Sequence, residues 1–283
     1  MEKIVNDEVI SVKVSKLSIT SINEMEENQP KKLQISSVER PIRCLKKKLL
    51  VLDVNGLLVD IVSPPPKHKK ADATIARKAI FKRPYYLEFL NFCFENFEVG
   101  VWSSRTQKNV DNVIDYLMGN MKQRLLFCWS YRCLHGISFY QAKGHSYCTE
   151  TSFKTLENKH KTLVFKDLRK IWENSDPSAQ WEKGYYNESN TLLLDDSPYK
   201  ALLNPPRTSV FPHTYKFENQ NDNSLAVEGD MRQYLEGLAN ADNMQKYVEE
   251  HPIGQESIRE SSEFWSFYLQ VIDSVSASSQ PKW

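Results

Sequence analysis

Four short hydrophobic runs in this sequence each end in a polar cluster. The runs cover residues 49–52, 97–102, 162–165 and 191–194, and the residues after them include aspartates, serines and a lysine. Short, almost continuously apolar segments are typical of strands buried on both faces of a parallel sheet. Ligands bind to open sheets of this kind beyond the carboxyl ends of the strands. If the four strands are neighbours, their polar clusters therefore converge on one crevice.

Apolar residues between and after these runs recur at helical spacing. The pattern predicts helices over 85–96 and 107–117, a third that starts near 229, and a last one over 260–275. Strands that alternate with helices favour right-handed βαβ units. The expected fold class is α/β, with a parallel sheet and flanking helices.

The chain has 283 residues and divides by composition. Residues 1–41 are polar with scattered aliphatics, which predicts a disordered N-terminal segment. We expect one domain over 42–250, in which the long connection 119–160 is an inserted region. Residues 251–283 are expected to form a C-terminal helical extension.

The residues at the ends of the runs suit phosphoryl transfer. Asp53 could attack phosphorus, and a carboxylate group that includes Asp195 and Asp196 could hold Mg²⁺ through oxygen ligands. The hydroxyl of Ser103 and the ammonium of Lys166 could bind phosphate oxygens. Taken alone, each residue also has an ordinary structural explanation, such as a helix cap or a surface lysine.

Five sequence elements occur in a defined order between residues 45 and 250. They are Asp53-Val54-Asn55-Gly56-Leu57, Lys82-Arg83-Pro84, Ser103, Lys166-Asp167-Leu168 and Asp195-Asp196-Ser197-Pro198. This series resembles the FCP/SCP-type branch of the haloacid-dehalogenase (HAD) superfamily, the phosphatases that act on the C-terminal domain of RNA polymerase II and their relatives. The resemblance implies a HAD-like, Rossmann-like fold and a phosphorylated protein or peptide as the partner.

The resemblance also assigns roles to individual residues. It implies that Asp53 is the nucleophile, which forms an aspartyl-phosphate, and that Ser103 and Lys166 bind the phosphate. The cofactor would be Mg²⁺, held by Asp53, Asp195, Asp196 and the backbone carbonyl of Asn55. The reaction expected from these roles is hydrolysis of phosphoserine or phosphothreonine in a protein.

Asn55 breaks the family pattern. The family has an Asp at this position, which protonates the leaving group and then activates water, and an amide cannot shuttle a proton. Loss of a general acid/base costs about 10²–10⁴ in rate, so the sequence predicts a slow or inactive phosphatase. Cys128 is a second departure, because the family often has a phosphate-binding Arg there; Arg132 could compensate.

Two functions of different classes are therefore open at this point. One is an impaired Mg²⁺-dependent phosphoprotein phosphatase, and the other is a non-catalytic binding module, or pseudophosphatase. The presequence-receptor subunit of the mitochondrial inner-membrane translocase carries an FCP-like domain and is a precedent for the second. A zinc site at Cys128, Cys133, His135, His145 and Cys148 is disfavoured, because their spacing lacks the paired C-x2-C signature.

Composition narrows the cellular setting. The content of hydrophobic residues, 40%, is sufficient for one substantial core, and no run approaches the roughly 20 apolar residues of a membrane span. The first residues resemble neither a signal peptide nor a transit peptide, which favours a nuclear or cytoplasmic address over the mitochondrial alternative. A net charge of +1 gives no general attraction to nucleic acid or membrane, and the oligomeric state is left open.

Overall fold

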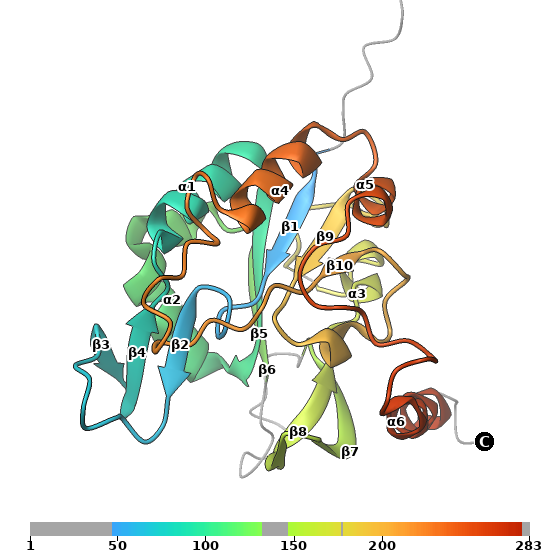
Figure 1. Ribbon diagram of the computed structural model, residues 1–283. Helices are drawn as coiled ribbons and strands as arrows, with labels where there is room; N and C mark the ends of the chain where they lie inside the picture. The colour runs from blue at the N-terminus through green and yellow to red at the C-terminus, as the bar shows by residue number, and fades with distance from the viewer. Residues whose placement is uncertain (1–46, 132–146, 177, 279–283) are drawn as a thin grey trace, which may run out of the picture. The chain divides into compact units, whose positions relative to one another are not determined.

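The computed structural model describes residues 47–131, 147–176 and 178–278 (Figure 1). The segment 1–41 lies outside these ranges, so its disorder stays a prediction. In the described ranges, no helix has the length and apolar content that a membrane crossing requires.

The central sheet has five strands in the order β10-β9-β1-β5-β6, and all neighbouring pairs are parallel. The strands are β1 (Leu49–Leu52), β5 (Glu98–Thr106), β6 (Phe127–Tyr131), β9 (Thr191–Leu194) and β10 (Ser209–Val210). Leu52 of β1 lies beside Val101 of β5 and Leu194 of β9. Three of the predicted apolar runs are therefore adjacent, and the α/β fold class with a parallel sheet is confirmed.

Both faces of β1 are covered, which explains its uninterrupted apolar sequence. Leu50 and Leu52 pack into a cluster with buried residues of four helices, whereas Leu49 and Val51 pack into a second cluster that includes Ile171. The four helices are α1 (Tyr86–Asn96), α2 (Gln107–Met118), α4 (Asp230–Asn240) and α5 (Met244–Glu250), and Ile171 lies in α3 (Arg169–Trp172). Figure 1 shows α1, α2 and α4 together on one side of β1 and α3 on the other.

The run 162–165 does not belong to the central sheet, which corrects the prediction that it is a fourth parallel strand. It ends β8 (Asn158–Phe165), which pairs antiparallel with β7 (Thr149–Thr155) in a separate sheet. Leu163 and Phe165 are buried because they pack on Tyr199 and on the C-terminal helix α6 (Trp265–Ser278). Burial against loops and a helix thus gives the same apolar pattern as burial inside a sheet.

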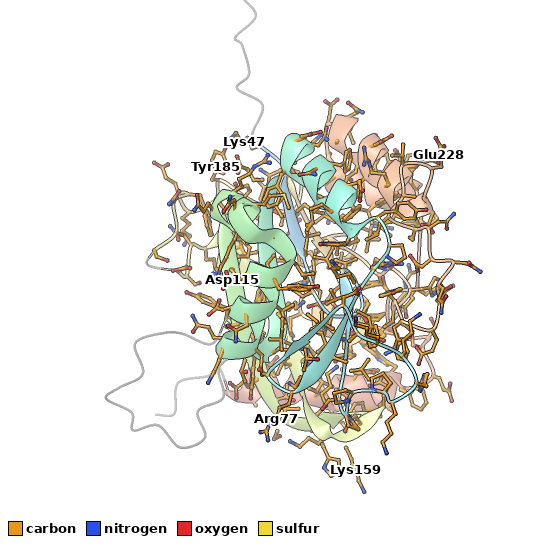
Figure 2. All side chains as sticks on the ribbon, turned by 90° about the vertical axis from the view of Figure 1, so that its left-hand side faces the viewer. Lys47, Arg77, Asp115, Lys159, Tyr185 and Glu228 are labelled. Atoms are coloured by element: carbon orange, nitrogen blue, oxygen red, sulfur yellow. The ribbon has the colours of Figure 1, made fainter. Side chains whose placement is uncertain are left out.

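The remaining elements frame this arrangement. Residues 119–160, predicted as an inserted region, contain the 3-10 helix η1 (Gly119–Arg124), strand β6, all of β7 and part of β8 in their described part. A small sheet, β2-β4-β3 (Val59–Val62, Lys78–Lys82, Ala73–Ile75), and helix α5 (Met244–Glu250) were not predicted. The predicted helices 85–96 and 107–117 correspond to α1 and α2. In Figure 2, Lys159 labels the end of the β7–β8 hairpin and Asp115 the outer side of α2.

Candidate active site

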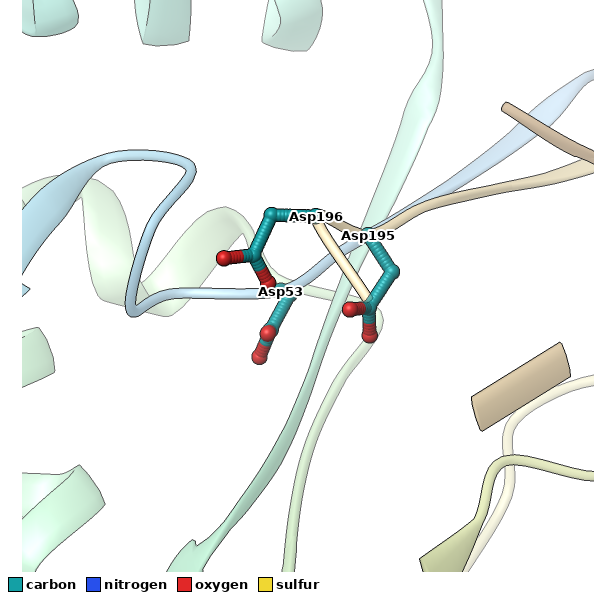
Figure 3. A group of neighbouring side chains, drawn as sticks. All are labelled: Asp53, Asp195 and Asp196. Atoms are coloured by element: carbon teal, nitrogen blue, oxygen red, sulfur yellow. The ribbon is translucent and has the colours of Figure 1, made fainter. Parts of the chain in front are cut away.

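Three aspartates meet where β1 and β9 end side by side. The backbone N–H of Asp53 donates to the carbonyl of Leu194 at 2.9 Å, so Asp53 lies next to Asp195 and Asp196, which follow β9. All three side chains are buried, and oxygen atoms of the three carboxylates lie within 4.8 Å of one another. Figure 3 shows them on the two adjacent segments. The site is thus at the carboxyl ends of parallel strands, as the sequence predicts.

Lys166 reaches the aspartates from the hairpin rather than from the central sheet. It follows β8, and its backbone N–H donates to the carbonyl of Lys200 at 2.8 Å. Its fully buried ammonium donates to Asp195 and lies 3.1 Å from Asp53 Oδ1. The predicted contact between Lys166 and the carboxylates therefore exists, although the strand that delivers it is antiparallel.

Lys200 is a site residue that the sequence analysis missed. It lies in the 3-10 helix η3 (Pro198–Ala201), directly after the Asp195-Asp196-Ser197 segment, and its side chain is buried. Its ammonium is 2.7 Å from Asp53 Oδ2, 2.8 Å from Asp195 Oδ1 and 3.8 Å from Asp196 Oδ1. Each oxygen of Asp53 thus faces a different lysine.

The two lysines determine the protonation state of Asp53. Burial by itself would raise the pKa of Asp53, but the charges of Lys166 and Lys200 outweigh it and hold the pKa well below its usual range. Asp196 is different, because burial and the neighbouring carboxylates raise its pKa against the opposing charge of Lys200. The pKa of Lys200 is raised well above its usual value, because the three carboxylates outweigh burial. Asp53 is therefore ionised near neutral pH.

The side chains of Asn55 and Ser103 both accept hydrogen bonds from Arg105. Oδ1 of Asn55 accepts from the N–H of Ile61 at 2.9 Å and from Nη2 of Arg105 at 3.2 Å. Ser103 is buried, and its Oγ accepts from the N–H of Arg105 at 3.2 Å. Arg105 is a second basic group that the sequence analysis missed. Burial lowers its pKa, while the charges of Asp53 and Asp60 act in the opposite direction.

Gly56 permits the close approach of the first loop to the aspartates. Its φ is +85°, and a Cβ built on it would lie 1.9 Å from Oδ2 of Asp196. A side chain at this position is therefore excluded twice, by the left-handed backbone and by the carboxylate. The sequence Asn55-Gly56 fits both requirements of the turn.

Cys128 lies beside α2. Burial raises its pKa to about 11, and the charged groups that act on it are Asp111, Asp115 and Lys122, from α2 and η1. A role in phosphate binding at this position thus has no support from its surroundings. Arg132 and three members of the disfavoured zinc set, Cys133, His135 and His145, lie outside the described residues.

A parallel α/β domain with a buried aspartate and lysine cluster at its strand ends has the layout of a HAD-type phosphatase domain. Residues 48–245 match the family described as NLI interacting factor-like phosphatase. The chain belongs to this family, and the predicted resemblance to FCP/SCP-type phosphatases is confirmed.

Individual relatives are distant. An uncharacterized FCP1 homology domain-containing protein of Schizosaccharomyces pombe is 24% identical over 217 residues, which cover 73% of this chain and 77% of the relative. The ubiquitin-like domain-containing CTD phosphatase 1 of Xenopus tropicalis is 24% identical over 262 residues, with coverage of 87% and 68%.

A solved structure of Fcp1, an essential RNA polymerase II CTD phosphatase, shares 11% identity with a TM-score of 0.38. The match covers 82% of this chain and 63% of the Fcp1 chain. This likeness is too weak to carry an argument about the site.

Proposed function

We propose that this domain accepts a phosphoryl group on Asp53 from phosphoserine or phosphothreonine of a protein, and that release of the phosphate is slow or absent. The observation that carries the proposal is the ionised, buried carboxylate of Asp53 between two lysines at the strand ends. A nucleophilic carboxylate has to be deprotonated, and these ammonium groups keep it so.

The chemistry follows from the positions of the charged groups. An Asp53 oxygen attacks phosphorus, the bond from phosphorus to the ester oxygen breaks, and that oxygen leaves with the electron pair and takes a proton from water. Lys166, Lys200 and Arg105 supply positive charge for the phosphate oxygens. In the second step, water attacks the aspartyl-phosphate and releases phosphate, which regenerates the carboxylate.

Asn55 accounts for the predicted stall. Its side chain accepts hydrogen bonds from Ile61 and Arg105, and its amide can neither transfer a proton to the leaving group nor take one from water. An aryl phosphate does not need the missing proton donor, because its leaving group needs little protonation. Attack of water on the aspartyl-phosphate still lacks a base, so phosphorylated Asp53 should accumulate.

The proposed Mg²⁺ ligands have suitable chemistry, because Mg²⁺ prefers carboxylate and carbonyl oxygens. Their position is shared with the ammonium of Lys200, which lies among the same three carboxylates. The residues therefore do not fit the ion while Lys200 is in place. Binding of Mg²⁺ by Asp53, Asn55, Asp195 and Asp196 stays a prediction for a state in which Lys200 has withdrawn.

A binding module without turnover is the second candidate. It is favoured by the burial of Asp53, whose side chain is 3% exposed and has both oxygens engaged by lysines. In this case the domain would hold a phosphorylated segment without transfer of the phosphoryl group. The phosphoprotein partner is proposed from the family and from the CTD phosphatases among its relatives, and the nuclear or cytoplasmic location stays a prediction.

Mass spectrometry of the intact protein after exposure to an aryl phosphate separates the candidates. We expect one added phosphoryl group, mapped to Asp53 by peptide analysis and lost in Asp53→Asn. Asp167→Asn is the matched control, because it alters another buried aspartate at the end of a strand whose partner is Arg169. If wild-type protein stays unmodified, phosphoryl transfer to Asp53 is refuted and the binding module is the remaining candidate.

A further inference from the structure

The ammonium of Lys200 lies among the three carboxylates that the family resemblance assigns to a metal ion. Its distances to oxygens of Asp53, Asp195 and Asp196 are 2.7, 2.8 and 3.8 Å. Within the described ranges, these three residues are the one acidic group with the spacing of metal ligands. Mg²⁺ needs ligand oxygens at about 2.0–2.1 Å on several sides. An ion and this ammonium therefore exclude each other.

The backbone holds Lys200 in this position. Pro198 is the first residue of η3, and the turn brings the Lys200 side chain back over the strand ends, where the Lys200 N–H donates to the Ser197 carbonyl at 3.1 Å. The Lys200 carbonyl accepts from the N–H of Lys166 at 2.8 Å. The lysine is thus fixed at both backbone polar atoms, and its side chain is 3% exposed.

We infer that Lys200 is a tethered cation that takes the place of the divalent ion, so that the wild-type site is complete without metal. The inference concerns the same site as the proposed function, and only the contact of Lys200 with a phosphorylated Asp53 rests on that function. Lys200 would neutralise Asp53 and Asp195 in the resting protein and would contact the phosphate oxygens in the phosphorylated one. In this chain, the reaction at Asp53 therefore does not require a bound metal ion.

Displacement of Lys200 by an ion carries a large penalty. An ion that enters has to move a buried ammonium away from its carboxylate partners into water or a less favourable site. If Lys200 is withdrawn in about one molecule in a hundred, the apparent affinity for Mg²⁺ falls about 100-fold relative to an open site. Wild-type protein should accordingly be insensitive to millimolar Mg²⁺.

The test is thermal unfolding with increasing MgCl₂, supported by calorimetric titration of the folded protein. Wild type should show no saturable shift of Tm. Lys200→Met leaves three carboxylates against the single ammonium of Lys166, so it should unfold at a lower Tm in EDTA and regain stability with Mg²⁺. We expect Mg²⁺ to bind this variant on the order of 100-fold more tightly than wild type.

Two matched variants identify the cause. Lys200→Arg keeps a cation and should stay insensitive to Mg²⁺. Lys161→Met removes a different lysine that is influenced by the same carboxylates but whose ammonium lies over the ring of Tyr199, and it should also gain no ion affinity. A gain of equal size in Lys161→Met or Lys200→Arg would show that general loss of positive charge, and not the position of Lys200, controls ion binding.

Wild-type protein alone is enough to overturn the inference if Lys200→Met does not fold. A saturable Mg²⁺ isotherm for wild type that is abolished by Asp195→Asn would place the ion among these carboxylates despite Lys200. The absence of any such isotherm supports the inference. Phosphorylation of Asp53 is a separate measurement: if Asp53 stays unmodified but wild type ignores Mg²⁺, the proposed function fails and the tethered cation stands.

Discussion

Asn55→Asp restores the group that the family pattern has at this position, with almost no change in shape. The acceptor oxygen that receives hydrogen bonds from Ile61 and Arg105 is present in both residues. The changed atom is the amide nitrogen, which becomes a second carboxylate oxygen. Arg105 is already in contact with the side chain, so it can compensate the added negative charge. The fold should therefore accept the variant.

The expected gain in rate follows from which step limits turnover. A positioned general acid/base contributes about 10²–10⁴ in rate, which corresponds to roughly 3–5 kcal/mol of barrier. Arg105 would keep the new carboxylate ionised, so activation of water should gain more than protonation of the leaving group. The increase should therefore appear mainly in hydrolysis of phosphorylated Asp53.

A pre-steady-state assay with an aryl phosphate measures the two steps separately. Wild type should release one aryl group per protein and then stop, whereas Asn55→Asp should continue to turn over after the same burst. Asn109→Asp makes the same chemical change on α2, where the amide donates to Thr106, and it should behave like wild type. Asp53→Asn combined with Asn55→Asp gives the background rate.

The decisive contrary result would be Asn55→Asp protein that folds with unchanged Tm, shows the burst, and still does not turn over. The missing carboxylate would then not be the defect. Lys200→Met added to Asn55→Asp, assayed with Mg²⁺, tests whether the lysine obstructs water at Asp53. If neither variant exceeds wild type, the assignment of the stall to Asn55 is wrong.

Three further outcomes test the structure of the site. Lys166→Met should lower the free energy of unfolding in urea by about 3–5 kcal/mol, because it strands buried carboxylates, whereas Lys122→Met in a partly exposed pair should cost at most about 1 kcal/mol; similar losses would contradict the assignment. Gly56→Ala should lower Tm more than Gly119→Ala, because both have positive φ but only at Gly56 would the added Cβ lie 1.9 Å from a carboxylate oxygen; equal shifts would remove the steric argument. The pKa of Asp53 is lower in the folded than in the unfolded protein, so its ionised form stabilises the fold above the unfolded-state pKa of about 3.9. This stabilisation is lost as pH falls toward the folded-state pKa, so the free energy of unfolding of Asp53→Asn should depend less on pH below about pH 4.

The sequence predicts the central strands because their environment is simple. Runs such as 49–52 and 191–194 are buried on both faces, so nearly every residue is apolar, and the polar residue that ends each run marks the carboxyl end of a strand. Asp53 and Asp195 could therefore be placed together without coordinates. Strand β6 was missed because Phe127–Tyr131 contains a cysteine, a serine and a tyrosine, which weakens the apolar signal.

The run 162–165 shows where the same reasoning fails. Its residues are nearly as apolar as those of β1, but η3 and α6 bury Leu163 and Phe165, and the run pairs only with the antiparallel strand β7. Val164 packs against the central sheet in the cluster that contains Leu49 and Val51. Hydrophobic patterning reports the degree of burial and not the identity of the covering elements. The pattern placed Lys166 beside the aspartates through a strand assignment that is wrong, whereas the family resemblance assigns it to the site without that strand.

Lys200 was missed for a related reason, although its sequence position carries a usable signal. A lysine four residues after Asp196 and five after Asp195 would lie about 13 Å or more from both in an extended chain, and Pro198 is what indicates a turn between them. A tight turn after a strand directs the residue at its end back toward the strand terminus. Buried carboxylates at that terminus need cationic partners or a metal ion. Lysine at this spacing supplies such a partner within the chain itself, which is why the ion requirement of the family does not follow for this protein from its aspartates alone.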